Sequence, residues 1–254
     1  MQTPWVLNGF YKHTQRQPLR DAMAIRESCR IFAKPPSGEQ WSALQDAAQS
    51  LALPGTRLQL GECENTLFQP FGGLLMRFEN VQRFAAIIVE EETPQSIVDA
   101  GIGGEMLMLS AVALGLGGVW VMGTYKRSQL RLNLNPGERV KSLIGLGVPQ
   151  KPPVPPLTRK RKALAQLCTG GFDEANPLMV RMALAVQNAP SAMNLQPWRM
   201  AWQSPAEMSI QVAKNSALLD LGIGLSHALL TLEDATPVIS LSDDGLCAHI
   251  ALPL

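Results

Sequence analysis

The sequence predicts a fold of the α+β class, and three observations support this prediction. Helical and strand-like patterns are mixed along the whole chain of 254 residues. A proline-rich connector at 149–157 separates two sides, and each side contains both kinds of pattern. A segment on one side also resembles a segment on the other. The length suits one large domain or two small ones.

The elements before the connector follow from apolar spacing and from β-branched runs. The expected elements are helices near 19–27 and 39–52, a strand at 83–91, a helix at about 94–114, and strands at 118–123 and 139–148. No charged residue occurs from Met106 to Thr124, a length that could just span a bilayer. The glycines of LGLGG at 114–118 interrupt this stretch, so we expect a buried helix followed by a buried strand.

The connector itself contains five prolines in the eight residues 149–156, which exclude a helix or a central strand. We therefore expect an extended, polyproline-like segment there. Beyond it the same patterns continue. The expected elements are helices near 160–168, 177–188 and 218–232, and strands near 199–203, 208–213, 236–241 and 246–252.

The similarity between the two sides lies in one pair of segments. VDAGIGGEMLMLSA at 98–111 aligns with LDLGIGLSHALLTL at 219–232, and both begin an apolar helix after a strand. The identical pairs are Asp99 and Asp220, Gly101 and Gly222, Ile102 and Ile223, and Gly103 and Gly224. We interpret this as a weak internal duplication. The single compact unit 1–254 would then be a fused pseudo-dimer with halves 1–150 and 158–254.

Composition argues against several classes of function. The 22 basic and 21 acidic residues argue against a nucleic-acid binder that works by bulk charge. The four cysteines are far apart and form no CxxC pair, which argues against a disulfide framework or zinc site and suits a reducing cytoplasm. The first thirty residues show no secretory signal. The three histidines lack metal-ligand spacing and no G-x-S-x-G motif occurs, so we expect His227 to be a core residue.

Two basic segments are candidate anion sites. In IRESCRIF, Arg26, Ser28 and Arg30 alternate, so in an extended segment they face the same way and could cradle a phosphate. The alternative is a solvated arginine face, and Glu27 adds a negative charge beside the proposed site. A second cluster, TRKRK at 158–162, is either a solvated run or a source of further phosphate ligands. In the latter case Arg159 and Arg161 would join the first cluster.

A glycine-rich stretch, ALGLGGVWVMG at 113–123, matches neither the G-x-G-x-x-G fingerprint nor a P-loop. Its glycines, Gly115, Gly117 and Gly118, still permit a close approach of the backbone to a ligand. The alternative is that they only end a helix before a buried strand.

Another unusual stretch is QNAPSAMNLQPWRM at 187–200. It holds two prolines, a serine, two carboxamide side chains and a tryptophan just after an apolar helix pattern. Such a loop presents hydrogen-bonding groups on a stiff backbone beside an aromatic ring. That arrangement suits a flat ligand with a polar edge.

The segments RESCR, APSAMNLQPW, ALGLGGVW, SLIGLGVP and RKRKAL together resemble landmarks of the FMN-dependent nitroreductase family. The resemblance covers roughly residues 20 to 235 and implies a mixed sheet flanked by helices. The family's Asn-x-Gln-Pro-Trp loop usually follows the arginine motif by about thirty residues, but here that place reads LALPGTRLQL at 51–60, an eroded copy. The intact loop lies in the second half. The chain thus resembles a divergent branch in which one chain mimics the family's homodimer.

The resemblance implies one FMN site per chain, between the halves. In it, Asn194 and Gln196 match the polar edge of the flavin ring, while Trp198 packs beneath the loop. The implied cofactor-binding residues are Arg26, Ser28, Arg30, Gly115, Gly117, Gly118, Arg159, Arg161, Pro190, Ser191, Ala192, Asn194 and Gln196. No metal and no catalytic side chain are implied, because the flavin carries the chemistry.

The implied activity is that of an oxidoreductase that passes hydride from NADH or NADPH through flavin N5 to a nitroaromatic, quinone or enone. Two alternatives stay open: a flavin-binding protein without robust turnover, and a degenerate structural member that binds no flavin. The expected partner is a small-molecule substrate, with neither nucleic acid nor membrane. We expect a cytoplasmic monomer that mimics a dimer, with a further homodimer possible.

Overall fold

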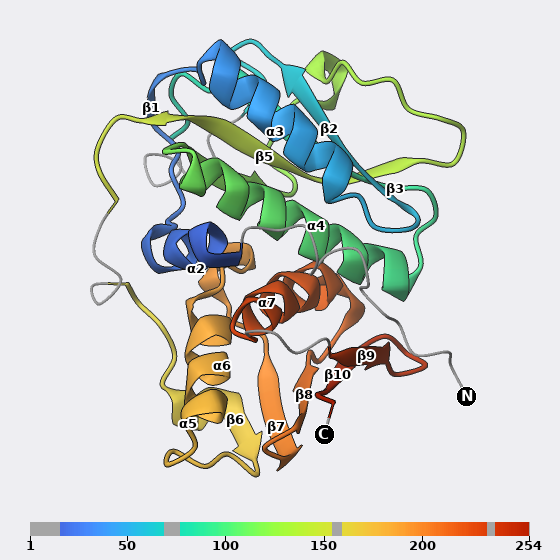
Figure 1. Cartoon of the computed structure of the whole chain (residues 1–254). Coiled ribbons are helices and arrows are strands. Elements are labelled where there is room, and N and C mark those ends of the chain that lie inside the picture. The colour runs from blue at the N-terminus through green and yellow to red at the C-terminus, as the bar shows by residue number, and fades with distance from the viewer. Residues whose placement is uncertain (1–15, 69–76, 154–158, 233–236, 254) are drawn as a thin grey trace. The chain divides into compact units, whose positions relative to one another are not determined.

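The computed structural model describes residues 16–68, 77–153, 159–232 and 237–253 (Figure 1). The chain forms two compact units, and each combines segments that are far apart in sequence. Unit 1 takes its described residues from 1–23, 93–102 and 160–254, and unit 2 takes them from 24–92 and 103–159. The border at Arg159 and Lys160 follows the predicted connector. The predicted pseudo-dimer of two halves stays a prediction.

Unit 2 is built on a five-stranded sheet in which every pairing is antiparallel. The strand order is β1-β5-β3-β2, and β4 also pairs with β5. The elements are β1 (Phe32–Lys34), α3 (Gly38–Ser50), β2 (Thr56–Glu62), β3 (Arg83–Val89), β4 (Gly117–Val121), η2 (Arg127–Gln129) and β5 (Arg139–Pro149). The last six residues of β3 are buried, as the predicted apolar run requires. Helix α3 lies beside β2 (Figure 1).

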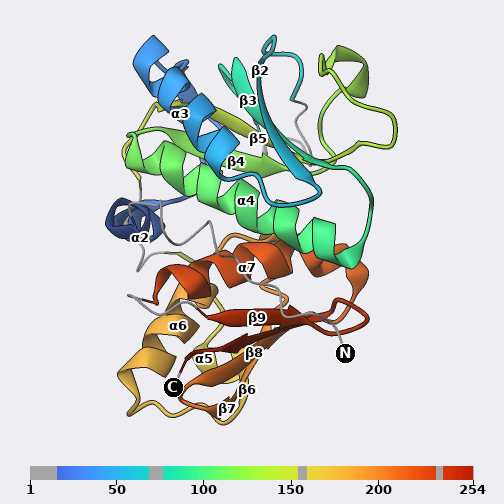
Figure 2. The same ribbon diagram turned by 45° about the vertical axis from the view of Figure 1, so that its right-hand side comes forward.

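Unit 1 contains a second sheet, with strand order β6-β7-β8-β10-β9. The β6–β7 pair is parallel and the other pairs are antiparallel, so this sheet is mixed. Helix α7 runs over it with α6 packed beside α7 (Figure 2). The elements are α5 (Leu164–Leu167), β6 (Cys168–Gly170), α6 (Pro177–Asn188), η4 (Ala192–Asn194), β7 (Arg199–Ser204), β8 (Glu207–Gln211), η5 (Asn215–Ala217), α7 (Leu218–Leu230), β9 (Val238–Leu241) and β10 (Cys247–Ala251).

Two helices cross the border between the units along the chain. Helix α2 (Arg16–Ile25) begins in unit 1, and α4 (Pro94–Ala113) has its first nine residues there. Among the described residues, α4 alone is long and apolar enough to pass as a membrane span, but 83% of that window is buried within the protein. Burial confirms the prediction of a buried helix followed by a buried strand, β4.

The α+β class is confirmed, but the prediction of a helix near 160–168 is wrong. Only the four residues of α5 are helical there, and β6 follows directly. The reason is a contact with a distant part of the chain: backbone groups of Lys160 and Lys162 bond to side chains of another loop, so they are not available to a helix. The segment 51–60, predicted to be an eroded loop, forms a turn and the first part of β2. Residues 154–157 of the connector, and Thr158 after it, lie outside the described residues.

Candidate functional site

The RESCR segment of unit 2 lies between α2 and β1 and is irregular apart from one bridge, which pairs Ser28 with Gly118 of β4. Arg26 is only 3% exposed, yet its Nε and Nη1 have no hydrogen-bond partner among the described residues. The Nε of Arg30 is also buried without such a partner. Buried guanidinium donors without acceptors are costly, and an anion would satisfy them.

A buried carboxylate lies beside these arginines. Oε1 of Glu105, which is fully buried on α4, is 3.8 Å from Nε of Arg26, and its Oε2 accepts a 2.8 Å hydrogen bond from Nε1 of Trp120. Burial lowers the pKa of the Arg26 guanidinium, whereas the Glu105 charge raises it and the charge of Arg159 lowers it. Arg26, Ser28, Arg30, Glu105 and Arg159 are called the arginine cluster below.

The predicted glycines have distinct local roles. Gly115 has φ +78° and follows α4, where the N–H groups of Gly115 and Leu116 bond to carbonyls of Val112 and Ala111. This is a Schellman ending, which requires a residue in the left-handed conformation. A Cβ on Gly117 would lie 2.8 Å from Cβ of Cys29, so this glycine lets the RESCR segment approach β4. A further role in holding a ligand stays a prediction.

The loop from 189 to 198 in unit 1, here called the Pro-Ser loop, joins α6 to β7. Three of its residues other than glycine have left-handed backbones: Met193 at φ 50°, Asn194 at φ 57° and Gln196 at φ 45°. This conformation costs about 1–2 kcal/mol for most such residues, and it persists only where surrounding contacts enforce it. Met193 is 74% exposed and Leu195 57%, so the loop presents apolar side chains to its surroundings.

The basic segment 160–162 runs along this loop and bonds to it repeatedly. The backbone N–H of Lys162 donates to Oε1 of Gln196 at 2.9 Å, and Nζ of Lys162 donates to the carbonyl of Leu195 at 2.7 Å. Nη1 of Arg161 donates to Oδ1 of Asn194 at 2.7 Å. The two predicted flavin-reading carboxamides are therefore engaged within unit 1, and Gln196 is buried. Their contact with a flavin stays a prediction.

The loop is also bonded to α7. The backbone N–H of Ala192 donates to Oδ1 of Asp220 at 3.0 Å, and Nε1 of Trp198 donates to the carbonyl of Asp220 at 2.7 Å. Trp198 is fully buried, which confirms that it packs beneath the loop. Burial raises the pKa of Asp220 to about 6, and the bond from Ala192 lowers it.

The structure thus places the predicted residues in two groups, one per unit. Unit 2 brings the RESCR side chains, the glycines and Arg159 together, and unit 1 brings Arg161 to the Pro-Ser loop. Sequence reasoning missed Glu105, although an acid in an apolar helix is a signal. It also missed the bond of Asp220 to the loop. His227 is a buried residue whose Nδ1 is 3.1 Å from the carbonyl of Ala185, which confirms the core interpretation.

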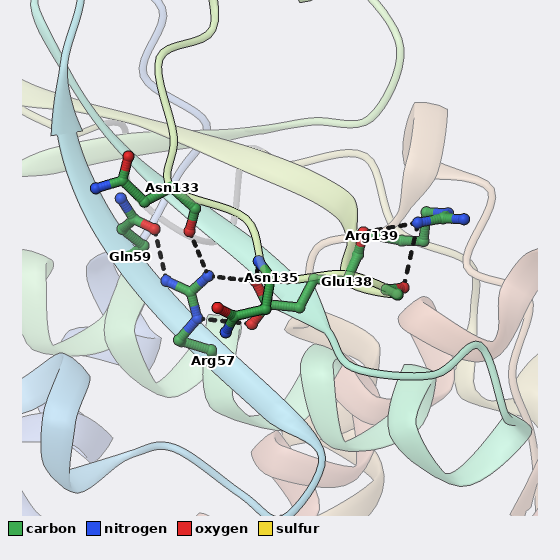
Figure 3. A network of polar contacts seen from close by, with 7 residues as sticks. Arg57, Gln59, Asn133, Asn135, Glu138 and Arg139 are labelled. Atoms are coloured by element: carbon green, nitrogen blue, oxygen red, sulfur yellow. Dashed lines mark hydrogen bonds and ion pairs between the residues drawn. The ribbon is translucent and has the colours of Figure 1, made fainter.

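A further polar network lies in unit 2 and is structural in character (Figure 3). Arg57 on β2 donates to both carboxylate oxygens of Glu138, at 2.9 and 2.6 Å. It also donates to Gln59 and to the carbonyl of Asn133. The Arg57 guanidinium and the N–H of Asn135 hold the pKa of Glu138 at about 2. The network therefore fastens the segment before β5 to β2.

A family model described as "Putative TM nitroreductase" matches residues 18–232 of the chain. The chain belongs to this nitroreductase family. A crystal structure of a "putative nitroreductase" from Thermotoga maritima is similar to the present chain with a TM-score of 0.67 and 23% identity. That match covers 96% of this chain and 98% of the other. The likeness shows the nitroreductase fold.

Smaller structures match parts of this chain. An "FMN-dependent Nitroreductase" from Clostridium difficile is 19% identical, with a TM-score of 0.42, over 51% of this chain and 87% of that one. A "Putative NADH dehydrogenase/NAD(P)H nitroreductase" from Parabacteroides distasonis is 20% identical, with a TM-score of 0.47, over 61% and 99%. No curated protein matches the chain. Membership of the nitroreductase family indicates an oxidoreductase.

Proposed function

We propose that this protein binds FMN and passes hydride from NADH or NADPH to a nitroaromatic, quinone or enone acceptor. The observation that carries the proposal is the set of buried arginine donors in unit 2. Nε and Nη1 of Arg26 and Nε of Arg30 have no hydrogen-bond partner among the described residues, and a phosphate oxygen would supply the missing acceptors. The resemblance of RESCR to the family's phosphate motif supports the same role.

Three residues of the arginine cluster would donate hydrogen bonds to a phosphate. Arg26 and Arg30 would donate to its oxygens, and Ser28 would add a hydroxyl donor. Glu105 counters part of the positive charge and leaves the cluster with a modest net attraction for an anion. FMN, when bound, supplies the hydride acceptor and donor, so the chain needs to bind and orient rather than to act as acid or base.

The Pro-Ser loop fits a flavin less directly. Pro190 is buried and Ser191 Oγ accepts from the N–H of Gln196 at 2.9 Å, so the loop is stiff and ordered before any ligand binds. The carboxamides of Asn194 and Gln196 already bond to segment 160–162. That engagement favours the second candidate function, a flavin-binding protein without robust turnover.

An absorption spectrum of the purified protein, before and after anaerobic addition of NADPH and then NADH, tests the proposal. Flavin bands at one FMN per chain that either reductant bleaches support the oxidoreductase. Bands that neither reductant changes support the flavin-binding protein instead. A colourless protein that takes up no added FMN contradicts flavin binding and supports the degenerate structural member.

The phosphate role is tested by comparing FMN with riboflavin, which lacks the phosphate. Arg30→Gln should weaken FMN binding about tenfold and leave riboflavin binding nearly unchanged, since one charge-assisted contact is lost. Arg127→Gln, an exposed arginine on η2 of the same unit, is the matched control. Arg26 is tested only together with Glu105→Gln, because the loss of Arg26 alone would remove the positive charge beside the buried carboxylate of Glu105. Equal losses for both flavins would contradict the phosphate role.

A further inference from the structure

One turn of α7 holds the Pro-Ser loop at both ends. The side chain of Asp220 accepts from the N–H of Ala192 near the start of the loop, and its carbonyl accepts from Nε1 of Trp198 at the end. A Cβ on Gly224, one turn further along α7, would lie only 2.5–3.0 Å from the indole of Trp198. The indole therefore lies directly on the helix backbone, and both loop ends are fastened to the same short segment.

The residues between these two attachments are the strained ones. Met193, Asn194 and Gln196 have left-handed backbones, and the Ala192 N–H comes immediately before them. Asp220 is 6% exposed and lies in the first turn of α7, where the helix dipole favours a negative charge. Its bond to Ala192 thus fixes the chain at the point where the strained turn begins.

We propose that Asp220 is a positioning residue for flavin binding, which keeps Ser191 and the following loop residues in the conformation that meets the ring. This inference rests on the proposed function, because it assigns the loop a contact with FMN. Asp220 bonds to the loop through the N–H of Ala192 and Nε1 of Trp198. It therefore acts on the ligand through the loop backbone and is not a catalytic residue.

The chain offers a matched control within the same unit. Asp99 occupies the aligned position of α4, and it is 2% exposed. Its Oδ2 accepts from Nε2 of Gln95 at 3.0 Å, and its Oδ1 has no hydrogen-bond partner among the described residues. Asp99 is thus a buried helix carboxylate like Asp220, but no loop N–H bonds to it. Substitution at either position removes a buried charge, but of the two only substitution at Asp220 also removes a contact with the loop.

The experiment compares Asp220→Leu and Asp220→Asn with Asp99→Leu and Asp99→Asn. Two quantities are measured: the FMN dissociation constant, and hydrogen exchange at the Ala192 amide of the flavin-free protein. We expect Asp220→Leu to weaken FMN binding about tenfold and to speed the exchange at Ala192. Asp220→Asn keeps an acceptor oxygen, so it should restore both values to within about threefold of the wild type. Both Asp99 variants should leave them unchanged.

The outcomes separate this inference from the proposed function. A wild-type protein that binds no FMN contradicts the proposed function, and the Ala192 exchange still shows whether Asp220 holds the loop. The positioning role is overturned if the wild-type protein binds FMN and Asp220→Leu behaves like the wild type. It is also overturned if Asp220→Leu and Asp99→Leu behave alike. Should Asp220→Leu fail to fold, Ala192→Pro removes the donor instead. Ser191 already has the extended backbone, φ −144° and ψ 160°, that a following proline requires.

Discussion

Asp99 is a carboxylate buried on α4, and burial raises its pKa to about 7, with the bond from Gln95 as the opposing effect. A raised folded pKa means that the ionised form is disfavoured in the fold. Asp99 therefore destabilises the folded protein progressively as the pH rises from its usual pKa of about 4 to its folded pKa of about 7. We predict that Asp99→Asn raises the free energy of unfolding at pH 8 by about 1–2 kcal/mol, because the disfavoured buried charge is removed. The gain is no larger because the new amide is itself partly unsatisfied.

Urea unfolding at pH 4.5, 6 and 8 measures this effect of Asp99. The gain should be largest at pH 8 and should shrink toward pH 4.5, where the wild-type group is mostly protonated in the folded state. Asp46→Asn, at an exposed position on α3, is the control and should change little at any pH. A gain that does not depend on pH would contradict the prediction.

Glu138 is the opposite case at the same scale, because Arg57 holds its pKa at about 2, below the usual value. Its contribution to stability is present above about pH 4.5 and is lost as pH falls through about 2. Glu138→Gln should lower the free energy of unfolding by about 1–2 kcal/mol at pH 7, because half of the bidentate contact with the partly exposed Arg57 is lost. Denaturant midpoints at pH 7 and pH 3 check the prediction, and a larger loss at pH 3 would contradict it.

At the scale of elements, α7 and the first part of α4 contact one another through a reciprocal pair of glycines. A Cβ on Gly101 would clash with the carbonyl of Leu219, and a Cβ on Gly222 would clash with the carbonyl of Val98. In the alignment of the two segments, Val98 pairs with Leu219 and Gly101 with Gly222. Such an exchange of equivalent contacts is the signature of a twofold relation, so it supports the proposed internal duplication.

The close contact between α4 and α7 predicts that a larger residue at either glycine destabilises the protein. Gly101→Ala and Gly222→Ala should each lower the free energy of unfolding by about 1–3 kcal/mol, because the added methyl group meets backbone that cannot move aside easily. Gly38→Ala at the start of α3 is the control, since no described atom lies within 4 Å of its added Cβ. Thermal and urea unfolding measure all three. Tolerance of either helix substitution would contradict the close approach of these helices.

The elements predicted well from sequence are those whose ends carry their own signals. The predicted helix 177–188 matches α6, because Asn176 caps it and Pro177 begins it. The strands β1 and β6 escaped prediction because each has three residues and is specified by pairing with β5 or β7, which a local pattern does not contain.

For a related reason, the sequence predicted the segments of the candidate site but not the bonds that hold them. The Pro-Ser loop and RESCR have local signatures, so sequence alone located both. The bonds that determine the state of the loop come from Lys162 and Asp220, which are 34 and 28 residues away from their partners Gln196 and Ala192. Contacts at such separations depend on how the elements pack, and no short motif records them.

At the scale of the whole molecule, the chain carries one intact RESCR motif and one intact Pro-Ser loop. The resemblance implies that ordinary members of the family obtain these two parts from two chains. We therefore predict that the purified protein sediments as a 27.6 kDa monomer that carries one FMN. Sedimentation velocity recorded at a protein wavelength and at a flavin wavelength gives both the mass and the stoichiometry. Arg30→Gln should sediment at the same mass with less flavin, whereas an obligate dimer that loses FMN on dilution would show that one chain does not suffice.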